Sequence, residues 1–291
     1  ANVTSFRMGG VTFGAGMRPP HSNDHINFAM IMVHLAGCLG RCVADAIIND
    51  LIDVQTTVRT HFGWSYQDDF ESAHKLGTLM SSEAPLGVHL WSHLMRNKAL
   101  DSLKKKLHSA DKVIIVGASV SISNLEQLDS ANAVLIAADG SVGAVGSMSE
   151  LACIVTDFDG NPHIDKYAKD GMLLIAHAHG DNLAQWQSSL AKWSNLSSPP
   201  NLILSHQITE VIDGMYNFGG FTDGDRAVCM ALSLGVPKDR IALIGFSTDK
   251  VGQWSGQTNV ERKLEKLDWM LRILQMIGLG DQVSTNASEV C

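Results

Sequence analysis

The segment AHAHGDN, residues 176–182, holds two histidines, an aspartate and an asparagine directly after an apolar run. Its residues His177, His179 and Asp181 nearly match the H-x-H-x-D-H signature of hydrolases that use zinc to activate water. Asn182 stands where that signature has its last histidine, and only one further histidine follows in the chain. A zinc hydrolase is therefore one alternative, and a purely structural role for both histidines is another.

A pair of aspartates closes another apolar run, in the sequence DFDGN. Asp157 and Asp159 are two residues apart at the expected end of a strand, so their side chains point to the same side and can converge on one cation. Their oxygen ligands suit magnesium. An Asx turn through Asp159 and Gly160 is the alternative, because such sequences also reverse the chain.

Two further segments have a pattern typical of phosphate binding. In GGFTDGDRA, Thr222 or Asp223 could be a helix N-cap. The start of this helix could also bind a phosphate, but Asp223 and Asp225 would repel it unless a divalent cation or Arg226 intervenes. Magnesium together with a nucleotide satisfies this pattern. In GASVS, residues 117–121, the small residues would let a phosphate approach the backbone, although a strand-to-helix turn with serine as N-cap explains them equally well.

The elements that must position these residues follow from the hydrophobic pattern. Short apolar runs predict strands over 112–117, 133–139, 152–157, 171–179, 201–207 and 240–246. Amphipathic segments predict helices near 122–130, 146–151, 163–170, 181–193, 223–234 and 260–277. Apolar strands separated by helices indicate an α/β fold with a doubly wound, mostly parallel, Rossmann-like sheet. Ligands bind beyond the carboxyl ends of such strands, where the polar groups above occur.

Four segments are expected along the chain. A helical pattern over residues 41–110 predicts a small N-terminal domain, residues 111–278 form the α/β catalytic domain, and residues 279–291 a flexible tail. Residues 1–40 are an extension of unassigned status. A native segment, a misassigned start and a lipoprotein-like leader, suggested by LAGC, are the three alternatives.

Composition and charge narrow the class of protein. Of 291 residues, 45% are hydrophobic and 18% charged, which is typical of a globular protein, and the net charge of -8 argues against a nucleic-acid partner. The basic run LKKKLH, residues 103–108, indicates an exposed helix face.

Five scattered cysteines without metal-like pairing indicate free thiols and a cytoplasmic protein. The apolar run over residues 26–40 is too short to cross a membrane, and Trp186 and Trp193 are expected in the core.

The segments ACIVTDFDGN, LLIAHAHGDN, SHQ, YNFGGFTDGDRAVCMALSLG and IALIGF occur in this order. Together they resemble the archaeal-type 6-hydroxymethyl-7,8-dihydropterin pyrophosphokinase family over about residues 60–275. AADG followed by TDFDG is also similar to thiamine pyrophosphokinase. The resemblance implies Mg²⁺-dependent transfer of diphosphate from ATP, the co-substrate, to the hydroxymethyl group of a reduced pterin, with release of AMP. The product would enter tetrahydrofolate or tetrahydromethanopterin synthesis.

The resemblance also implies roles for individual residues. Magnesium would be held by Asp139, Asp157, Asp159 and Asp181. His177 and His179 would join the catalytic group through contacts with phosphate or pterin. The remaining contacts with nucleotide and pterin would come from Gly117, Ser119, Asp139, Gly140, Asn182, Gln207, Thr222, Asp223, Asp225 and Arg226.

Two departures from the family pattern leave alternatives open. The nucleotide loop reads GASVSIS where the family has a sequence closer to GAGPSL, and GFSTDK delays an expected aspartate to Asp249. A nucleotide-binding module without catalysis is therefore a further alternative. A related sugar-nucleotide glycosyltransferase-like enzyme is another, because motility-associated glycosyltransferase-like proteins contain a related domain. The sequence does not decide between the two pathways, the pterin side chain, the general base or the oligomeric state, for which a homodimer is one option.

Overall fold

The structure is a computed structural model that describes residues 7–8, 11–12, 49–128, 131–146, 149–256 and 259–285. The contacts divide the chain into a first unit, Ala1–Ala46, and a second unit, Ile47–Cys291. In the first unit, strands β1 (Arg7–Met8) and β2 (Val11–Thr12) pair antiparallel. The rest of the predicted extension, including LAGC, lies outside the described residues.

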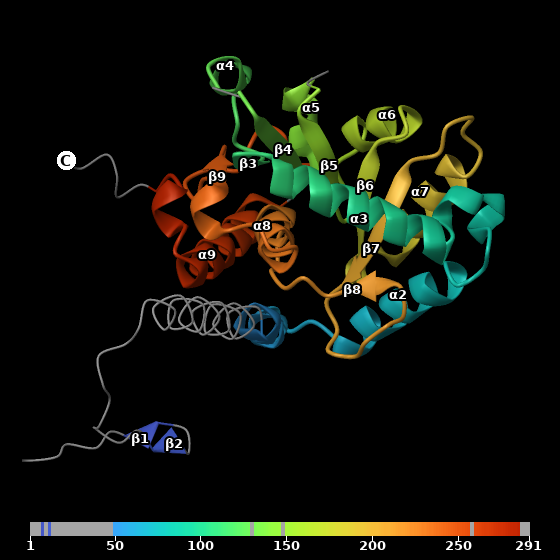
Figure 1. Ribbon diagram of the computed structural model, residues 1–291, viewed down its shortest axis with the longest axis horizontal. Coiled ribbons are helices and arrows are strands. Elements are labelled where there is room, and N and C mark those ends of the chain that lie inside the picture. Colours follow the sequence, from blue (N-terminus) through green and yellow to red (C-terminus); the bar gives the residue numbers. More distant parts are fainter. Residues whose placement is uncertain are drawn as a thin grey trace, which may run out of the picture. The chain divides into compact units, whose positions relative to one another are not determined.

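A seven-stranded parallel sheet forms the centre of the second unit (Figure 1). Its strands are β3 (Lys112–Val116), β4 (Ala133–Ala138), β5 (Leu151–Thr156), β6 (Leu173–Ala178), β7 (Asn201–His206), β8 (Met215–Tyr216) and β9 (Ile241–Ile244). They lie in the order β8-β7-β6-β5-β4-β3-β9, and every neighbouring pair is parallel. The predicted α/β class and all six predicted strands are confirmed. Strand β8 was missed because two residues are too few to show a pattern.

Helices cover both faces of the sheet because the chain crosses it in two directions. The crossovers from β3 to β7 contain α4 (Ile122–Glu126), α5 (Val142–Val145), α6 (His163–Lys169) and α7 (Leu183–Trp193). After β8 the chain returns through α8 (Asp223–Ser233) to β9, and α9 (Val260–Ile277) follows. Right-handed crossovers in opposite directions place their helices on opposite faces. In Figure 1, α4, α5 and α6 lie above the sheet and α8 and α9 below it.

One predicted helix is wrong. The helix expected near 146–151 is α5, which ends at Val145, and β5 already begins at Leu151. Gly146 follows α5 with φ 63°, a left-handed backbone that glycine adopts without strain and that stops the helix. The short 3-10 helices of the second unit are η1 (Pro85–Gly87), η2 (His89–Trp91), η3 (Asp139–Ser141), η4 (Gly180–Asn182), η5 (Lys238–Arg240) and η6 (Gly280–Gln282).

Two hydrophobic cores lie on the two faces of the sheet. Along β3, Val113 and Ile115 join one core, whereas Ile114 and Val116 join the other. This alternation explains why the strands are apolar throughout, since neither face meets water. The helix tryptophans predicted for the core are each 1% exposed.

The N-terminal helices pack onto these same cores. A helix over residues 49–62 and α3 (His93–Ser109) contribute to the core that contains α8 and α9, and α2 (Tyr66–Leu79) contributes to the opposite one. The division of the chain near residue 110 stays a prediction. The lysines of the run 103–108 are exposed, as expected. Leu279 and Val283 of the predicted tail are buried, and residues 286–291 lie outside the described residues.

The sheet has its topological switch point at β3. Strand β4 lies on one side of β3, and β9, which is reached only after the return crossover, lies on the other. The loops that follow these strands diverge and leave a crevice at their carboxyl ends. None of the helices in the described ranges is long and apolar enough to cross a membrane.

Candidate active site

A pocket opens at the carboxyl ends of the strands, beside the switch point. Its walls come from the loops after β3, β4, β5, β6, β7 and β9, from the start of α8 and from one side of α9. The predicted site residues that line it are Gly117, Ser119, Asp139, Gly140, Asp157, Asp159, His179, Asp181, Gln207, Thr222, Asp223 and Arg226. Three predicted residues do not line it: His177, Asn182 and Asp225.

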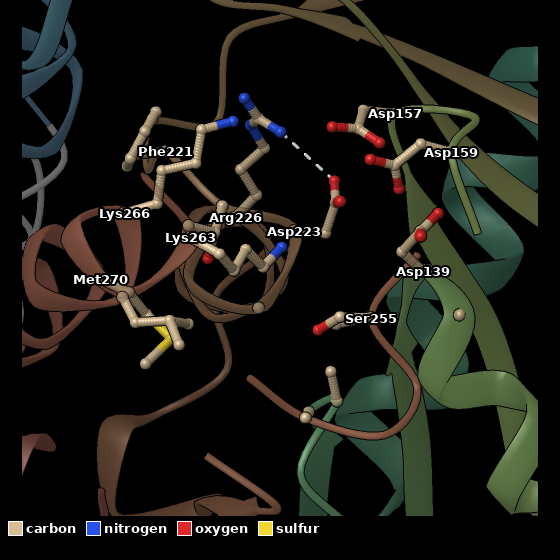
Figure 2. Close-up of a pocket in the computed structure, with 18 of the residues that line it drawn as sticks. Asp139, Asp157, Asp159, Phe221, Asp223, Arg226, Ser255, Lys263, Lys266 and Met270 are labelled. Atoms are coloured by element: carbon tan, nitrogen blue, oxygen red, sulfur yellow. Dashed lines mark hydrogen bonds and ion pairs between the residues drawn. The ribbon is translucent and has the colours of Figure 1, made fainter. Parts of the chain in front are cut away.

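Three aspartates converge on one wall of the pocket (Figure 2). Asp139, Asp157 and Asp159 each offer a carboxylate oxygen, and these oxygens lie within 4.8 Å of one another. Asp139 follows β4 with φ 47°, and Thr156 Oγ1 donates to its Oδ1 at 2.6 Å. Asp157 Oδ1 is buried and has no hydrogen-bond partner. A buried, unpaired oxygen among three carboxylates fits a hard divalent cation such as magnesium.

The pKa values of these aspartates are shifted in opposite directions. Burial raises the pKa of Asp139 well above its ordinary value, and the charges of Asp159, Asp223 and Asp157 raise it further. The charge of Asp157 and burial raise the pKa of Asp159. Without a cation, the three carboxylates therefore disfavour full ionisation of one another.

Asp157 is the ionised member of the group. Burial, the largest single effect, works against its ionisation, but the hydrogen bond and charge of His179 together with the charges of Arg226 and Lys263 outweigh it and lower the pKa of Asp157 far below the ordinary value. His179 Nε2 lies 3.5 Å from Asp157 Oδ2. Asp181, predicted as a fourth metal ligand, is exposed at the rim of the pocket and is not part of the triad.

A cationic wall faces the aspartates. Lys263 and Lys266 extend from α9 and Arg226 from α8, and Figure 2 shows them across the pocket from the triad. Burial lowers the pKa of Lys266. The sequence predicted α9 but not its lysines as site residues, because nothing in the helical pattern tells which side of α9 meets the pocket. One pocket thus offers carboxylates for a metal and cations for phosphate oxygens.

Aromatic and apolar side chains line the part of the pocket next to α9. Phe221 and Met270 are buried there, and Trp64 is half-buried. Lys266 Nζ lies 5.2 Å from the ring centre of Trp64 and 5.9 Å from that of Phe221. This surface suits a flat heterocycle close to a charged group. No sequence pattern pointed to this surface, because isolated aromatic residues usually belong to the hydrophobic core.

In the loop after β3, the backbone N–H groups of Gly117 and Ser119 are already used within the protein. The N–H of Gly117 donates to the carbonyl of Ile244 at 2.8 Å, and that of Ser119 donates to Gly245 at 2.9 Å. A Cβ on Gly117 would lie 2.6 Å from the Gly245 oxygen, so the close approach requires glycine. The serine N-cap expected as an alternative is Ser121, whose Oγ accepts from the backbone of α4.

Two residues of AHAHGDN hold the strand ends together. Asn182 Nδ2 donates to the carbonyls of Asp157 and His177, at 2.9 and 2.7 Å, and its Oδ1 accepts from the N–H of His179. His177 is 2% exposed, and burial lowers its pKa well below the ordinary value. Among the described residues, the aspartate triad rather than the histidines forms a group able to bind one ion. A zinc hydrolase gains no support.

The start of α8 combines a cap with a pocket residue. Thr222 is the N-cap, and its N–H and Oγ1 donate to Asp225 Oδ2 at 3.0 and 2.8 Å, while Phe221 N donates to Asp225 Oδ1. Asp225 is fully buried and acts as part of this cap. Asp223 lines the pocket and pairs with Arg226 Nη1 at 3.2 Å. The capping alternative thus applies to Thr222 and Asp225.

Comparison with curated proteins gives three relatives of the same description. The 6-hydroxymethyl-7,8-dihydropterin pyrophosphokinase of Pyrococcus furiosus is 33% identical over 188 residues, which are 60% of this chain and 76% of that protein. The protein of that name from Methanothermobacter thermautotrophicus is 33% identical over 141 residues, 48% of this chain and 57% of that protein. The one from Methanocaldococcus jannaschii is 27% identical over 179 residues, 58% of this chain and 68% of that protein. No protein-family model matches the chain. The chain belongs to the 6-hydroxymethyl-7,8-dihydropterin pyrophosphokinase family.

Proposed function

We propose that the protein transfers a diphosphate group from ATP to the hydroxymethyl group of 6-hydroxymethyl-7,8-dihydropterin and releases AMP. The observation that supports this most strongly is the opposition of three aspartates and three cations across one pocket. Phosphoryl-transfer sites need both, because phosphate charge must be neutralised while the nucleophile is positioned in line. The descriptions of the three relatives support the same reaction.

Magnesium would be held by Asp139, Asp157 and Asp159. When bound, it neutralises charge on the phosphate oxygens. Arg226, on the facing wall, contacts the transferred phosphates. The alcohol oxygen attacks the β-phosphorus, the bond from that phosphorus to the bridging oxygen of AMP breaks, and the hydroxyl proton is released to solvent.

The remaining pocket residues divide between the two substrates. Lys263 and Lys266 bind phosphate oxygens by charge. The pterin ring lies against Trp64 and Phe221, because their aromatic faces provide the flat apolar surface in the pocket. Asp181 at the rim stays a proposed ligand that completes the metal's coordination once substrate is present.

Product analysis tests this proposal. Purified protein with ATP, magnesium and 6-hydroxymethyl-7,8-dihydropterin should release AMP and form the pterin diphosphate in equal amounts, and EDTA should stop the reaction. Asp157→Asn should abolish turnover, whereas Asp165→Asn, remote from the pocket, should not. Formation of ADP, or preference for thiamine as acceptor, would refute the assignment.

The alternatives and the finer predictions have their own measurements. Turnover of a CMP-sugar in place of ATP would support the glycosyltransferase, and nucleotide binding without any product would support the non-catalytic module. Neither alternative gains support from the relatives. A cytoplasmic location and a homodimer stay predictions, which cell fractionation and sedimentation test.

A further inference from the structure

A chain of buried polar side chains connects the N-terminal helices with the pocket. Arg59, from the helix over residues 49–62, donates through Nε to Asp69 Oδ2 of α2 at 2.9 Å. Gln207 Nε2 donates to the same Asp69 oxygen at 2.9 Å. Gln207 Oε1 in turn accepts from Arg226 Nη2 at 2.9 Å. All four residues are at most 8% exposed, yet Arg59 and Asp69 do not line the pocket.

Asp69 and Arg226, on either side of Gln207, determine which way the Gln207 side-chain amide points. The carboxylate of Asp69, which pairs with Arg59, offers only acceptors, and the guanidinium of Arg226 offers only donors. A primary amide has one donor end and one acceptor end, so Gln207 satisfies both neighbours in one orientation only. The reversed amide would place oxygen against oxygen at Asp69 and N–H against N–H at Arg226.

The orientation of this amide matters for Arg226. Its Nη1 pairs with Asp223 and its Nη2 with Gln207, so both ends of the guanidinium are held. The triad lies on the facing wall (Figure 2), and Asp157 attracts Arg226 electrostatically. If Nη2 lost its acceptor, the guanidinium would be free to turn towards the carboxylates that magnesium needs.

We propose that Asp69 is a positioning residue for the diphosphate-transfer site: by orienting the Gln207 amide, it keeps Arg226 directed at the phosphates and away from the aspartate triad. The inference rests on the proposed function. It gives α2 a role in the reaction, although α2 contributes no residue to the pocket wall.

A second contact of Asp69 reaches the same site from another direction. Its Oδ1 accepts from the N–H of Gly180 at 2.8 Å, in the loop that carries His179 and Asp181. A Cβ on Gly180 would lie 2.7 Å from Asp68 Cβ, so the loop packs directly on α2. Asp69 therefore fixes the positions of two pocket elements, the Arg226 side chain through Gln207 and the His179 loop through Gly180.

A reciprocal exchange of acid and amide tests the proposal. Asp69→Asn replaces an acceptor with a donor towards Gln207, and Gln207→Glu places a carboxylate against Asp69. Each single variant should lower kcat/KM for ATP by about tenfold or more, because repulsion between residues 69 and 207 displaces the acceptor that holds Arg226 Nη2. The double variant keeps the total charge and restores a donor-to-acceptor contact between residues 69 and 207, so its kcat/KM should lie well above the product of the two single losses. It should stay below the wild type, because the new amide N–H also faces Arg59 Nε, which loses its acceptor.

Further variants separate positioning from stability. Asp165→Asn removes another carboxylate that has an ion pair and a tryptophan N–H partner, Lys192 and Trp193, and it should lower the melting temperature without changing kcat/KM. Gln207→Met should reproduce the loss of the single variants. In an Arg226→Met background, Asp69→Asn should add no further loss of kcat/KM, because the asparagine can keep the Gly180 contact through Oδ1 and the rest of the effect passes through Arg226.

Two results would overturn the proposal: a double variant as poor as the product of its singles, or a wild-type kcat/KM in Asp69→Asn. Calorimetric binding of α,β-methylene-ATP with magnesium provides a readout independent of turnover, and the same rescue is expected in its affinity. If the wild type binds this analogue but releases no AMP, the reaction is wrong while the positioning role is still measured. A wild type that does not bind the analogue overturns both.

Discussion

Replacing Asp139 by asparagine should make the metal-free protein more stable and the enzyme inactive. Asp139 is 8% exposed, its backbone has φ 47°, and asparagine tolerates this left-handed conformation better than most residues. Asparagine can also keep the hydrogen bond from Thr156 Oγ1. The substitution therefore removes one negative charge from the triad with little other change.

The magnitude follows from the spacing of the carboxylates. Two unit charges 4.8 Å apart repel by about 3.5 kcal/mol at an effective dielectric constant of about 20. The raised pKa of Asp139 means that part of this repulsion is already relieved by protonation. A gain of about 1 to 2 kcal/mol in the free energy of unfolding is expected, which is about 2 to 8 °C in Tm for a unit of this size.

Thermal melting with and without magnesium measures this effect. In EDTA, Asp139→Asn should melt above the wild type, whereas Asp53→Asn, on the exposed side of its helix, should not differ from it. Added magnesium should raise the Tm of the wild type but not of Asp139→Asn, and AMP release should fall by at least about 100-fold in the variant. A variant that melts below the wild type in EDTA, or that still responds to magnesium, would refute the reasoning.

Three further substitutions test other parts of the site and its support. Lys266→Met should raise KM for ATP by about tenfold, since a phosphate contact is lost, and Lys104→Met on the exposed face of α3 should leave it unchanged; equal KM values would exclude a phosphate role. His206→Asn should flatten the pH dependence of the free energy of unfolding, because burial lowers the pKa of His206 from 6.5 to about 4. The stability that neutral His206 contributes is complete above about pH 6.5 and is lost as the pH falls towards 4, by about 3 kcal/mol in chemical denaturation. His177, whose pKa is also lowered, still contributes in the variant. Asn182→Ala should lower the free energy of unfolding by about 2 to 4 kcal/mol, because it removes three hydrogen bonds between strand ends; a loss below about 0.5 kcal/mol would show that they do not hold the loops.

The sequence predicted the fold well because its signal is local. Each strand is a short apolar run, each long helix has an apolar stripe, and their alternation along the chain indicates a parallel sheet. The helix expected near 146–151 was placed after Gly146, whereas α5 lies before it. Strand β8 is defined by its pairing with β7 and not by its own two residues.

The site was predicted in part for the same reason. Asp139, Asp157 and Asp159 stand at strand ends, and the carboxyl ends of parallel strands meet at one edge, so their convergence follows from sequence order. His177 and Asn182 stand near a strand end too, but they do not line the pocket, and their side chains form hydrogen bonds with neighbouring strands and loops. Which side a polar residue faces there depends on the local backbone.

By itself, the sequence determined the α/β sheet, the strand ends that carry the acids and the resemblance to a pyrophosphokinase family, because these depend on residues near one another in the chain. Only the tertiary structure decided which side of α9 brings Lys263 and Lys266 to the pocket, and that Asp69 reaches Gln207, 138 residues away. These contacts depend on how separate helices pack on the sheet. Packing is set by the shape of the whole core, which no local pattern records.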